Sequence, residues 1–164
     1  MSSPTLVGMP ESWSSRVSRW GFNWFPAYRF TGARIESISA DWREVRIRLP
    51  LSWRTRNYVG TIFGGSMYAA LDPIHMVMLI KLLGPAYEVW DKAATIRFRR
   101  PGRNTLRATF RVEASDLETI RGIVAKDGKA EHRFTVDLLD AAGETIASCE
   151  KILSIRQKAT RQHG

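Results

Sequence analysis

Residues 64–83 read GGSMYAALDPIHMVMLIKLL, and this stretch decides the fold. Its twenty residues, at ~1.5 Å each, predict a helix of ~30 Å. Gly84 and Pro85 end it. Because the helix is apolar almost all round, we expect it to be buried on most sides.

The segments around this helix alternate between apolar and polar residues, as half-buried strands do. These segments are 33–39, 44–49, 96–99, 106–112, 132–138 and 144–155. Residues 116–126 fit either a short helix or an extended segment. A sheet with one apolar face needs a cover, and only 64–83 is long and apolar enough to provide it. The pattern predicts an α+β fold in which an antiparallel sheet wraps around one long central helix.

A second, amphipathic helix is expected near the N-terminus, with Pro10 in its first turn. Trp13, Val17, Trp20 and Trp24 recur at helical spacing and form an aromatic stripe. Such a stripe is more often used for packing than for ligand binding. Residues 23–32 are expected to be a turn-rich connection. We predict a single domain over residues 11–157, with disordered ends at 1–10 and 158–164.

The composition limits the classes of protein. Cys149 is the single cysteine, so an intramolecular disulfide is excluded. The start of the chain lacks a signal-peptide pattern, and the apolar run 74–83 is too short to span a membrane, so we expect a cytoplasmic protein. The net charge of +9 favours an anionic partner, although it can also serve solubility alone.

Asp72 is the only acidic residue of the predicted central helix. Burying a lone carboxylate among apolar side chains is costly, and perturbed acids cluster at active sites. Asp72 is therefore the leading candidate for a catalytic residue; the alternative is a structural hydrogen bond, for example with His75. His75 shares a helix face with Asp72 and either orients it or is a satisfied core histidine. Pro73 is expected to kink the helix beside the acid.

Gly64 and Gly65 open the same helix. The first N–H groups of a helix have no intrahelical partner and lie at the positive end of its dipole. Glycine lets another molecule approach that backbone closely. Such donors can polarise a carbonyl and hold the oxyanion formed when it is attacked.

Four arginines lie within residues 97–103 at the expected end of a strand. Guanidinium groups match phosphate geometry, so this cluster is a candidate phosphate clamp; the alternative is a solvated strand face. The sequence contains no H-E-x-x-H, C-x-x-C, P-loop or G-x-S-x-G motif. Three scattered histidines do not suggest a metal site.

The segment 57–65, NYVGTIFGG, followed by Asp72, resembles the hot-dog-fold thioesterases of the phenylacetate-pathway type. Their pattern is Asn, then Gly, then His-Gly-Gly, with an acid nine residues after the His. The segment 96–102, IRFRRPG, is also similar to theirs. Residues 23–32, with the Asp72-Pro73 pair, look like an uncharacterised branch of that superfamily, a domain of unknown function.

The resemblance implies an acyl-CoA thioesterase acting on a fatty-acyl or aryl-acyl group, as a homodimer or homotetramer with active sites shared between subunits. Asp72 would activate water or attack the thioester, the Gly65 N–H would face the carbonyl oxygen, and Asn57 would help position the site. Phe63 and His75 would contact the substrate. Arg99, Arg100 and Arg103 would lie near the phosphates of coenzyme A, which enters as part of the substrate. No separate cofactor and no metal are implied.

The sequence departs from the family pattern at two places. Phe63 stands where the family has His and cannot hydrogen-bond as His does. Asp91-Lys92 stands where several relatives carry Ser or Thr. The alternatives to hydrolysis are a non-catalytic hot-dog module that binds acyl-CoA or fatty acid and, ranked below it, a basic nucleic-acid-binding protein, which lacks any recognised motif.

Overall fold

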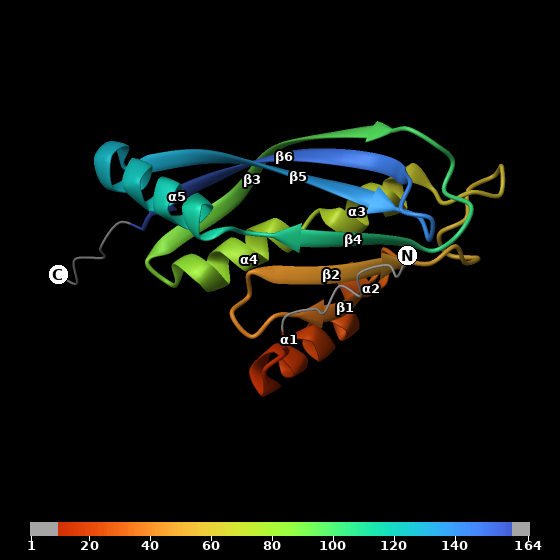
Figure 1. Cartoon of the computed structure of the whole chain (residues 1–164), viewed down its shortest axis with the longest axis horizontal. Helices are drawn as coiled ribbons and strands as arrows, with labels where there is room; N and C mark the ends of the chain where they lie inside the picture. The colour runs from red at the N-terminus through yellow and green to blue at the C-terminus, as the bar shows by residue number, and fades with distance from the viewer. Residues whose placement is uncertain (1–9, 159–164) are drawn as a thin grey trace, which may run out of the picture.

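A six-stranded antiparallel sheet curves around the central helical segment in the computed structural model, which describes residues 10–158 (Figure 1). The strand order is β1-β2-β4-β5-β6-β3. The strands are β1 (Arg34–Ile38), β2 (Glu44–Leu49), β3 (Tyr87–Phe98), β4 (Leu106–Arg111), β5 (Lys129–Leu139) and β6 (Thr145–Gln157). The helices are α1 (Trp13–Trp24), α2 (Pro26–Arg29), α3 (Gly64–Leu71), α4 (Ile74–Leu83) and α5 (Ala114–Asp127). The predicted fold class is confirmed.

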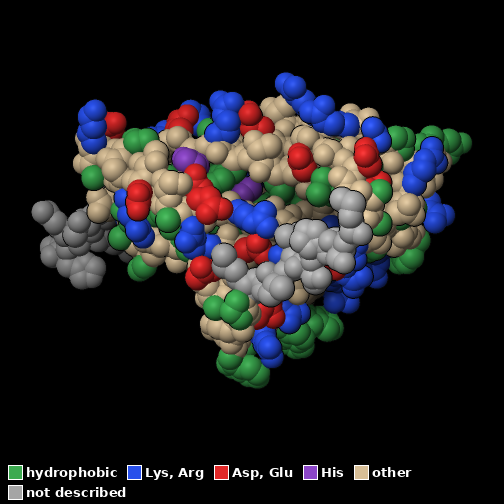
Figure 2. Space-filling model, viewed as in Figure 1, with side chains coloured by type: hydrophobic (Ala, Val, Ile, Leu, Met, Phe, Trp, Pro, Cys, Tyr) green, Lys and Arg blue, Asp and Glu red, His purple; other side chains and the backbone are tan. Residues whose placement is uncertain are grey.

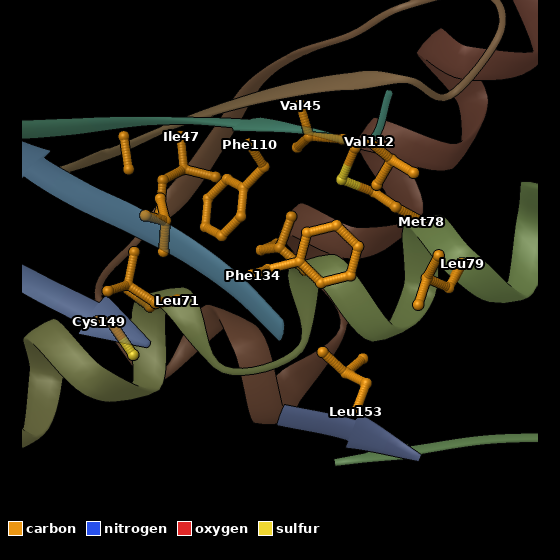
Figure 3. Packing of buried hydrophobic residues seen from close by; sticks show 14 of the residues in the cluster. Val45, Ile47, Leu71, Met78, Leu79, Phe110, Val112, Phe134, Cys149 and Leu153 are labelled. Atoms are coloured by element: carbon orange, nitrogen blue, oxygen red, sulfur yellow. The ribbon is translucent and has the colours of Figure 1, made fainter. Parts of the chain in front are cut away.

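The core forms between the concave face of the sheet and α3–α4 (Figure 3). Strand alternation supplies one half of it, because successive side chains point to opposite faces. In β4, for example, Leu106, Ala108 and Phe110 are buried while the residues between them are exposed. The helices supply the other half through Leu71 and Met78, both fully buried.

The central segment is two helices rather than the single helix that we expected. α3 ends at Leu71 and α4 begins at Ile74, so Asp72 and Pro73 lie between them. Proline explains the break, because it has no N–H to donate and its ring crowds the preceding turn. The predicted kink beside the acid is therefore present in a stronger form.

Residues Gly64–Leu83 are long and apolar enough to cross a membrane, judged by length and composition alone. In the structure this segment lies against the inside of the sheet (Figure 1). A buried core helix passes the same test of length and hydropathy, and its packing identifies it as one.

The N-terminal region differs from expectation in three ways. α1 begins at Trp13 rather than near Pro10, because the Ser12 hydroxyl accepts the Ser15 N–H and caps the helix there. The connection over 23–32 contains the short helix α2. The aromatic stripe does not pack into the core: Trp13 is 79% exposed and Trp20 67% exposed. The disorder expected at 1–10 and 158–164 falls, apart from Pro10 and Lys158, outside the described residues.

The segment 116–126, which the pattern left open, belongs to α5. Glu113 and Asp116 form a reciprocal capping box at its start. Gly128 ends it in the left-handed conformation, at φ 75°. The capping residues at both ends thus indicate a helix, although the apolar periodicity between them is weak.

β1 and β3 are the two edges of the sheet. β3 pairs with β6 along its whole length, with an irregularity between Asp91 and Ala93. Beyond this bulge, β3 residues 93–95 are exposed. An open edge of this kind presents unpaired backbone groups to another strand.

Candidate functional site

Asp72 occupies the break between α3 and α4, where backbone carbonyls lose their helical partners. Two of these carbonyls accept hydrogen bonds from side chains. The Tyr28 hydroxyl donates to the carbonyl of Ala70 at 3.2 Å, and the Lys151 ammonium donates to the carbonyl of Asp72. Side chains from α2 and β6 thus satisfy these two backbone carbonyls at the break between α3 and α4.

Lys151 is fully buried, and its ammonium lies between two carboxylates. Nζ is 3.2 Å from Oδ1 of Asp72 and 2.9 Å from Oδ2 of Asp91. It also lies at the C-terminal end of α3, where the helix dipole favours a cation. A buried ammonium is costly unless it is paired and hydrogen-bonded, and here both conditions are met. Asp72 is therefore paired with a cation, and the prediction of a lone buried acid was wrong.

Sequence reasoning missed Lys151, although β6 carries a signal for it. Cys149, Leu153 and Ile155 are apolar and alternate along the strand, and Lys151 holds the same face. A charged residue in the inward register of a strand predicts a buried partner of opposite charge.

Two further groups complete the cluster. The Tyr68 hydroxyl donates to Oδ1 of Asp72 at 2.9 Å. Burial, then the hydrogen bond and charge of Asp72, raise the pKa of Tyr68 to about 12, so the phenol stays protonated as a donor. Burial raises the pKa of Asp91, whose Oδ1 has no hydrogen-bond partner among residues 10–158. The Asp72 side chain is 45% exposed, which makes it the carboxylate that a ligand can reach.

Asp72 and Tyr68 line a cavity of about 710 Å³ between α1–α2 and α3–α4. The rest of the lining is largely apolar and includes Phe22, Phe25 and Met76. Pockets of this size and character hold small ligands, with a few polar groups fixing their orientation. The arrangement places a carboxylate beside an apolar compartment.

Trp42 forms part of the wall of this cavity, in the turn between β1 and β2. It is the only described residue other than glycine with a positive φ, at 60°. Bulky side chains rarely adopt this conformation, and it persists where the surroundings enforce it. The Lys81 ammonium lies 5.4 Å from the centre of the Trp42 ring. Sequence reasoning gave no role to either residue.

Four of the other predicted residues lie together at the N-terminal end of α3. Asn57, Gly64, Arg99 and Arg100 line a second cavity of about 400 Å³, with Phe98. Arg103 does not line it. Arg100 is bound to Glu144 at 2.7 Å, so its charge is partly used within the chain.

The two glycines are needed for close approach, but the groups that approach are aromatic rings of this chain. A Cβ at Gly64 would lie 2.9 Å from the ring of Phe98, and one at Gly65 would collide with the ring of Phe63. Phe63 is 57% exposed, so its ring can move aside for a ligand.

Asn57 acts on its own loop. Its side-chain oxygen accepts the N–H groups of Val59 and Thr61, and its Nδ2 donates to the Thr61 hydroxyl at 2.9 Å. The side chain thus shapes the loop that leads into α3 and leaves little hydrogen-bonding capacity for a ligand.

The two ends of α3 are too far apart to serve one small group. Gly65 and Asp72 are seven residues apart, which is ~10 Å along a helix. Reacting atoms must come within ~3.5 Å of each other. One carbonyl cannot contact the Gly65 N–H and the Asp72 carboxylate of the same chain.

His75 was expected at the site and lies in the core instead. It is 1% exposed, stacks on Phe134 at 4.5 Å between ring centres and meets Phe110 edge-on at 4.9 Å. It lines neither cavity. Burial, then the charge of Lys151, lower its pKa to about 3, so the ring is neutral near pH 7. The expectation that His75 binds substrate is corrected.

Within residues 10–158 there is no cluster of three or more His, Cys, Asp or Glu side chains that could hold a metal ion. Cys149 is buried and free.

Comparison with protein families matches residues 15–155 to DUF4442, a domain of unknown function. Comparison with curated protein sequences gives no match. Among solved structures, a Pseudomonas aeruginosa protein of unknown function, PA5026, described as a probable thioesterase, is similar with a TM-score of 0.78. It is 21% identical, and the match covers 92% of this chain and 100% of that one.

Two further structures are similar at lower identity. Thioesterase HI1161 of Haemophilus influenzae has a TM-score of 0.67 and 13% identity, over 93% of this chain and 97% of its own. The PaaI protein from the phenylacetic acid degradation operon of E. coli has a TM-score of 0.61 and 16% identity, over 90% and 93%. At these identities the likeness establishes the hot-dog fold.

The buried His75 predicts a specific pH dependence of stability. Its pKa is lower in the folded chain than in the unfolded chain, so acid favours unfolding as the pH falls from about 6.5 towards about 3. We expect the free energy of unfolding to fall between pH 7 and pH 5 by roughly 2 kcal/mol more in the wild type than in His75→Phe. Urea unfolding at both pH values measures this. An identical fall in both proteins would contradict the assignment.

Proposed function

The chain belongs to the DUF4442 family, and from its hot-dog fold and the groups around Asp72 we propose that it hydrolyses an acyl thioester of coenzyme A. The observation that carries the proposal is the Asp72 carboxylate, which is held by Lys151 and Tyr68 and borders a largely apolar cavity. An acyl group in that cavity would bring its thioester carbonyl to the carboxylate.

In the proposed reaction Asp72 removes a proton from water as the water oxygen attacks the carbonyl carbon, or attacks that carbon itself. The carbon–sulfur bond breaks, and the thiolate leaves and takes up a proton. When water attacks, the carboxylic acid forms directly; when Asp72 attacks, an acyl anhydride with Asp72 forms first, and water then hydrolyses it to the carboxylic acid and the free Asp72 carboxylate. The Tyr68 hydroxyl and the Lys151 ammonium hold Asp72 in one orientation, which raises the effective concentration of the reacting group. Asp72 is the catalytic residue, and the other two are positioning residues.

The oxyanion would form at the start of α3, where free N–H groups and the helix dipole favour negative charge. One chain cannot bring its own Gly65 to its own Asp72, so we propose that a second copy supplies one of them. The open edge of β3 is where a second copy would add to the sheet. The site would then be complete only in a homodimer or a dimer of dimers.

Coenzyme A would lie outside the acyl cavity, with its phosphates near the basic segment after β3. Arg99 fits this role, since it lines the second cavity and, within residues 10–158, makes one side-chain hydrogen bond, to Ser148, which is long at 3.4 Å. Arg103 forms no ion pair with the described residues. Guanidinium groups with unused donors are suited to phosphates.

A second candidate function is non-catalytic binding of an acyl thioester or fatty acid. The ring of Phe63 lies over Gly65 and the ring of Phe98 over Gly64, which restricts access to the helix N-terminus. In that case the cavity beside Asp72 would hold the acyl chain, and the ion cluster would serve structure.

Asp72→Asn separates hydrolysis from binding. If Asp72 is the base or nucleophile, kcat on a chain-length panel of acyl-CoAs should fall by ~10²-fold or more. Asp137→Asn, on an exposed position of β5, is the matched control and should keep the wild-type rate. Equal rates in wild type and Asp72→Asn would refute the proposed role, and thioester binding without turnover in the wild type would favour the binding module.

Lys151→Met tests the positioning role. Removing the buried cation leaves Asp72 and Asp91 without a counter-charge, so protons should be retained to higher pH. We expect the acid limb of the pH–kcat/KM profile to move to higher pH and kcat to fall by roughly 10-fold or more. Lys126→Met, an exposed lysine in the last turn of α5, is the control. An unchanged pH profile in a folded Lys151→Met protein would contradict the role.

The shared site is tested by mixing two inactive variants. Gly65→Val blocks the helix N-terminus and Asp72→Asn removes the acid. If each site takes Gly65 from one chain and Asp72 from its partner, half of the sites in a mixed dimer are intact. Refolding the two variants together at equal amounts should restore about one quarter of wild-type activity in an isologous dimer. If both groups come from one chain, no activity returns.

A further inference from the structure

α1 packs on the sheet with its polar side. The Ser15 hydroxyl donates to the carbonyl of Ser39 at 3.1 Å, and Asn23 exchanges two hydrogen bonds with the backbone of Ile35 in β1, at 2.8 and 3.0 Å. An amphipathic helix on a globular protein ordinarily turns its apolar stripe inward. Here the polar contacts fix the opposite orientation.

The apolar stripe consequently faces outward. Its residues, with two aromatic residues at α2, form what we call the aromatic surface: Trp13, Val17, Trp20, Trp24, Phe25 and Phe30. Each is between 55% and 79% exposed. Figure 2 shows hydrophobic side chains gathered at the foot of the molecule, over α1. Contiguous apolar surface of this kind marks an interaction site.

The charge around the aromatic surface is positive. Residues 12–35 contain no Asp or Glu and carry four arginines, at positions 16, 19, 29 and 34. Glu11, just before this segment, binds Arg19 at 3.0 Å and lies 3.8 Å from Arg16. The Arg29 guanidinium lies over the Trp24 ring, 4.4 Å from its centre.

The arginines at the α2 end also lie near other cations. The pKa of Arg34 lies below its ordinary value because of partial burial and, after that, the charges of Arg29, Arg54 and Arg48. A negative partner would relieve this repulsion, whereas another basic surface would add to it.

We propose that the aromatic surface docks on an anionic lipid bilayer. Tryptophan favours the membrane–water interface, where its ring is in contact with apolar chains and its N–H with water, and arginine binds lipid phosphates. A helix with large aromatic residues on one side and arginines beside them lies in the plane of such an interface. A second copy of the chain fits less well, because it would bring two positive surfaces together.

The aromatic surface borders the cavity beside Asp72. Phe25 belongs to both, and Gly21 and Phe22 of α1 line the cavity from the same helix. An acyl chain held in a bilayer could enter without crossing water. This consequence rests on the proposed function, whereas the docking itself does not.

The test is co-sedimentation of the full chain with vesicles of phosphatidylcholine containing roughly one third phosphatidylglycerol, against vesicles of phosphatidylcholine alone. The variant is Trp20→Ser/Trp24→Ser. The control is Ile123→Ser, which removes a 36%-exposed apolar side chain from α5 that belongs neither to the aromatic surface nor to the open β3 edge. Circular dichroism and Tm measurements check that each variant is folded, which we expect because the substituted side chains are exposed.

We expect the wild type and Ile123→Ser to bind the anionic vesicles at ~50 mM salt and to be released at ~500 mM. The double variant should bind ~10-fold more weakly or worse. No binding of the wild type to the anionic vesicles, or equal binding by the double variant, overturns the proposal. So does a lower assembly mass for the double variant in ultracentrifugation, because the surface would then be an interface between copies. Acyl-CoA hydrolysis is not a readout, so failure of docking and failure of the thioesterase assignment are distinguishable.

Discussion

The buried Lys151 ammonium is the interaction on which the site depends. It joins three parts of the chain that are distant in sequence: the end of α3, strand β3 and strand β6. Pro73 ends α3, and the Lys151 ammonium binds a backbone carbonyl at that helix end. Without the cation, two acids would lie in the same partly buried space with nothing to balance them. The ammonium thereby stabilises the break between α3 and α4 and holds Asp72 in one position there.

The length of α3 has the next largest influence. It separates the N-terminus of α3 from Asp72 by two turns. The first cavity is therefore lined by the acid, and the second by the start of the helix, where the oxyanion would form. Chemistry that needs both groups then depends on assembly, and the open β3 edge offers a way to assemble. The proposed dimer would thus couple assembly to the proposed activity, because the length of α3 separates the two groups within one chain.

Much of the fold follows from local patterns. The sequence predicts the alternation of β2 and β4, the buried segment 64–83 and the break at Pro73, because burial and backbone geometry depend on neighbouring residues. Asp72 could be singled out for the same reason. Lys151 was missed because its partners are 60 and 79 residues away, although its inward register was visible. Amphipathicity showed that α1 has two faces, but the hydrogen bonds of Ser15 to Ser39, just after β1, and of Asn23 to Ile35 in β1 decided which one is buried.

The same ion cluster also bears on how the sheet is put together. β3 is an edge strand with a bulge beside Asp91, and more than half of its residues are exposed, so side-chain packing specifies its alignment weakly. Displacing β3 by one residue along β6 would turn Asp91 outward and leave the ammonium with one carboxylate fewer. The contact between Asp91 and Lys151 therefore stabilises the observed register of β3 relative to a register displaced by one residue.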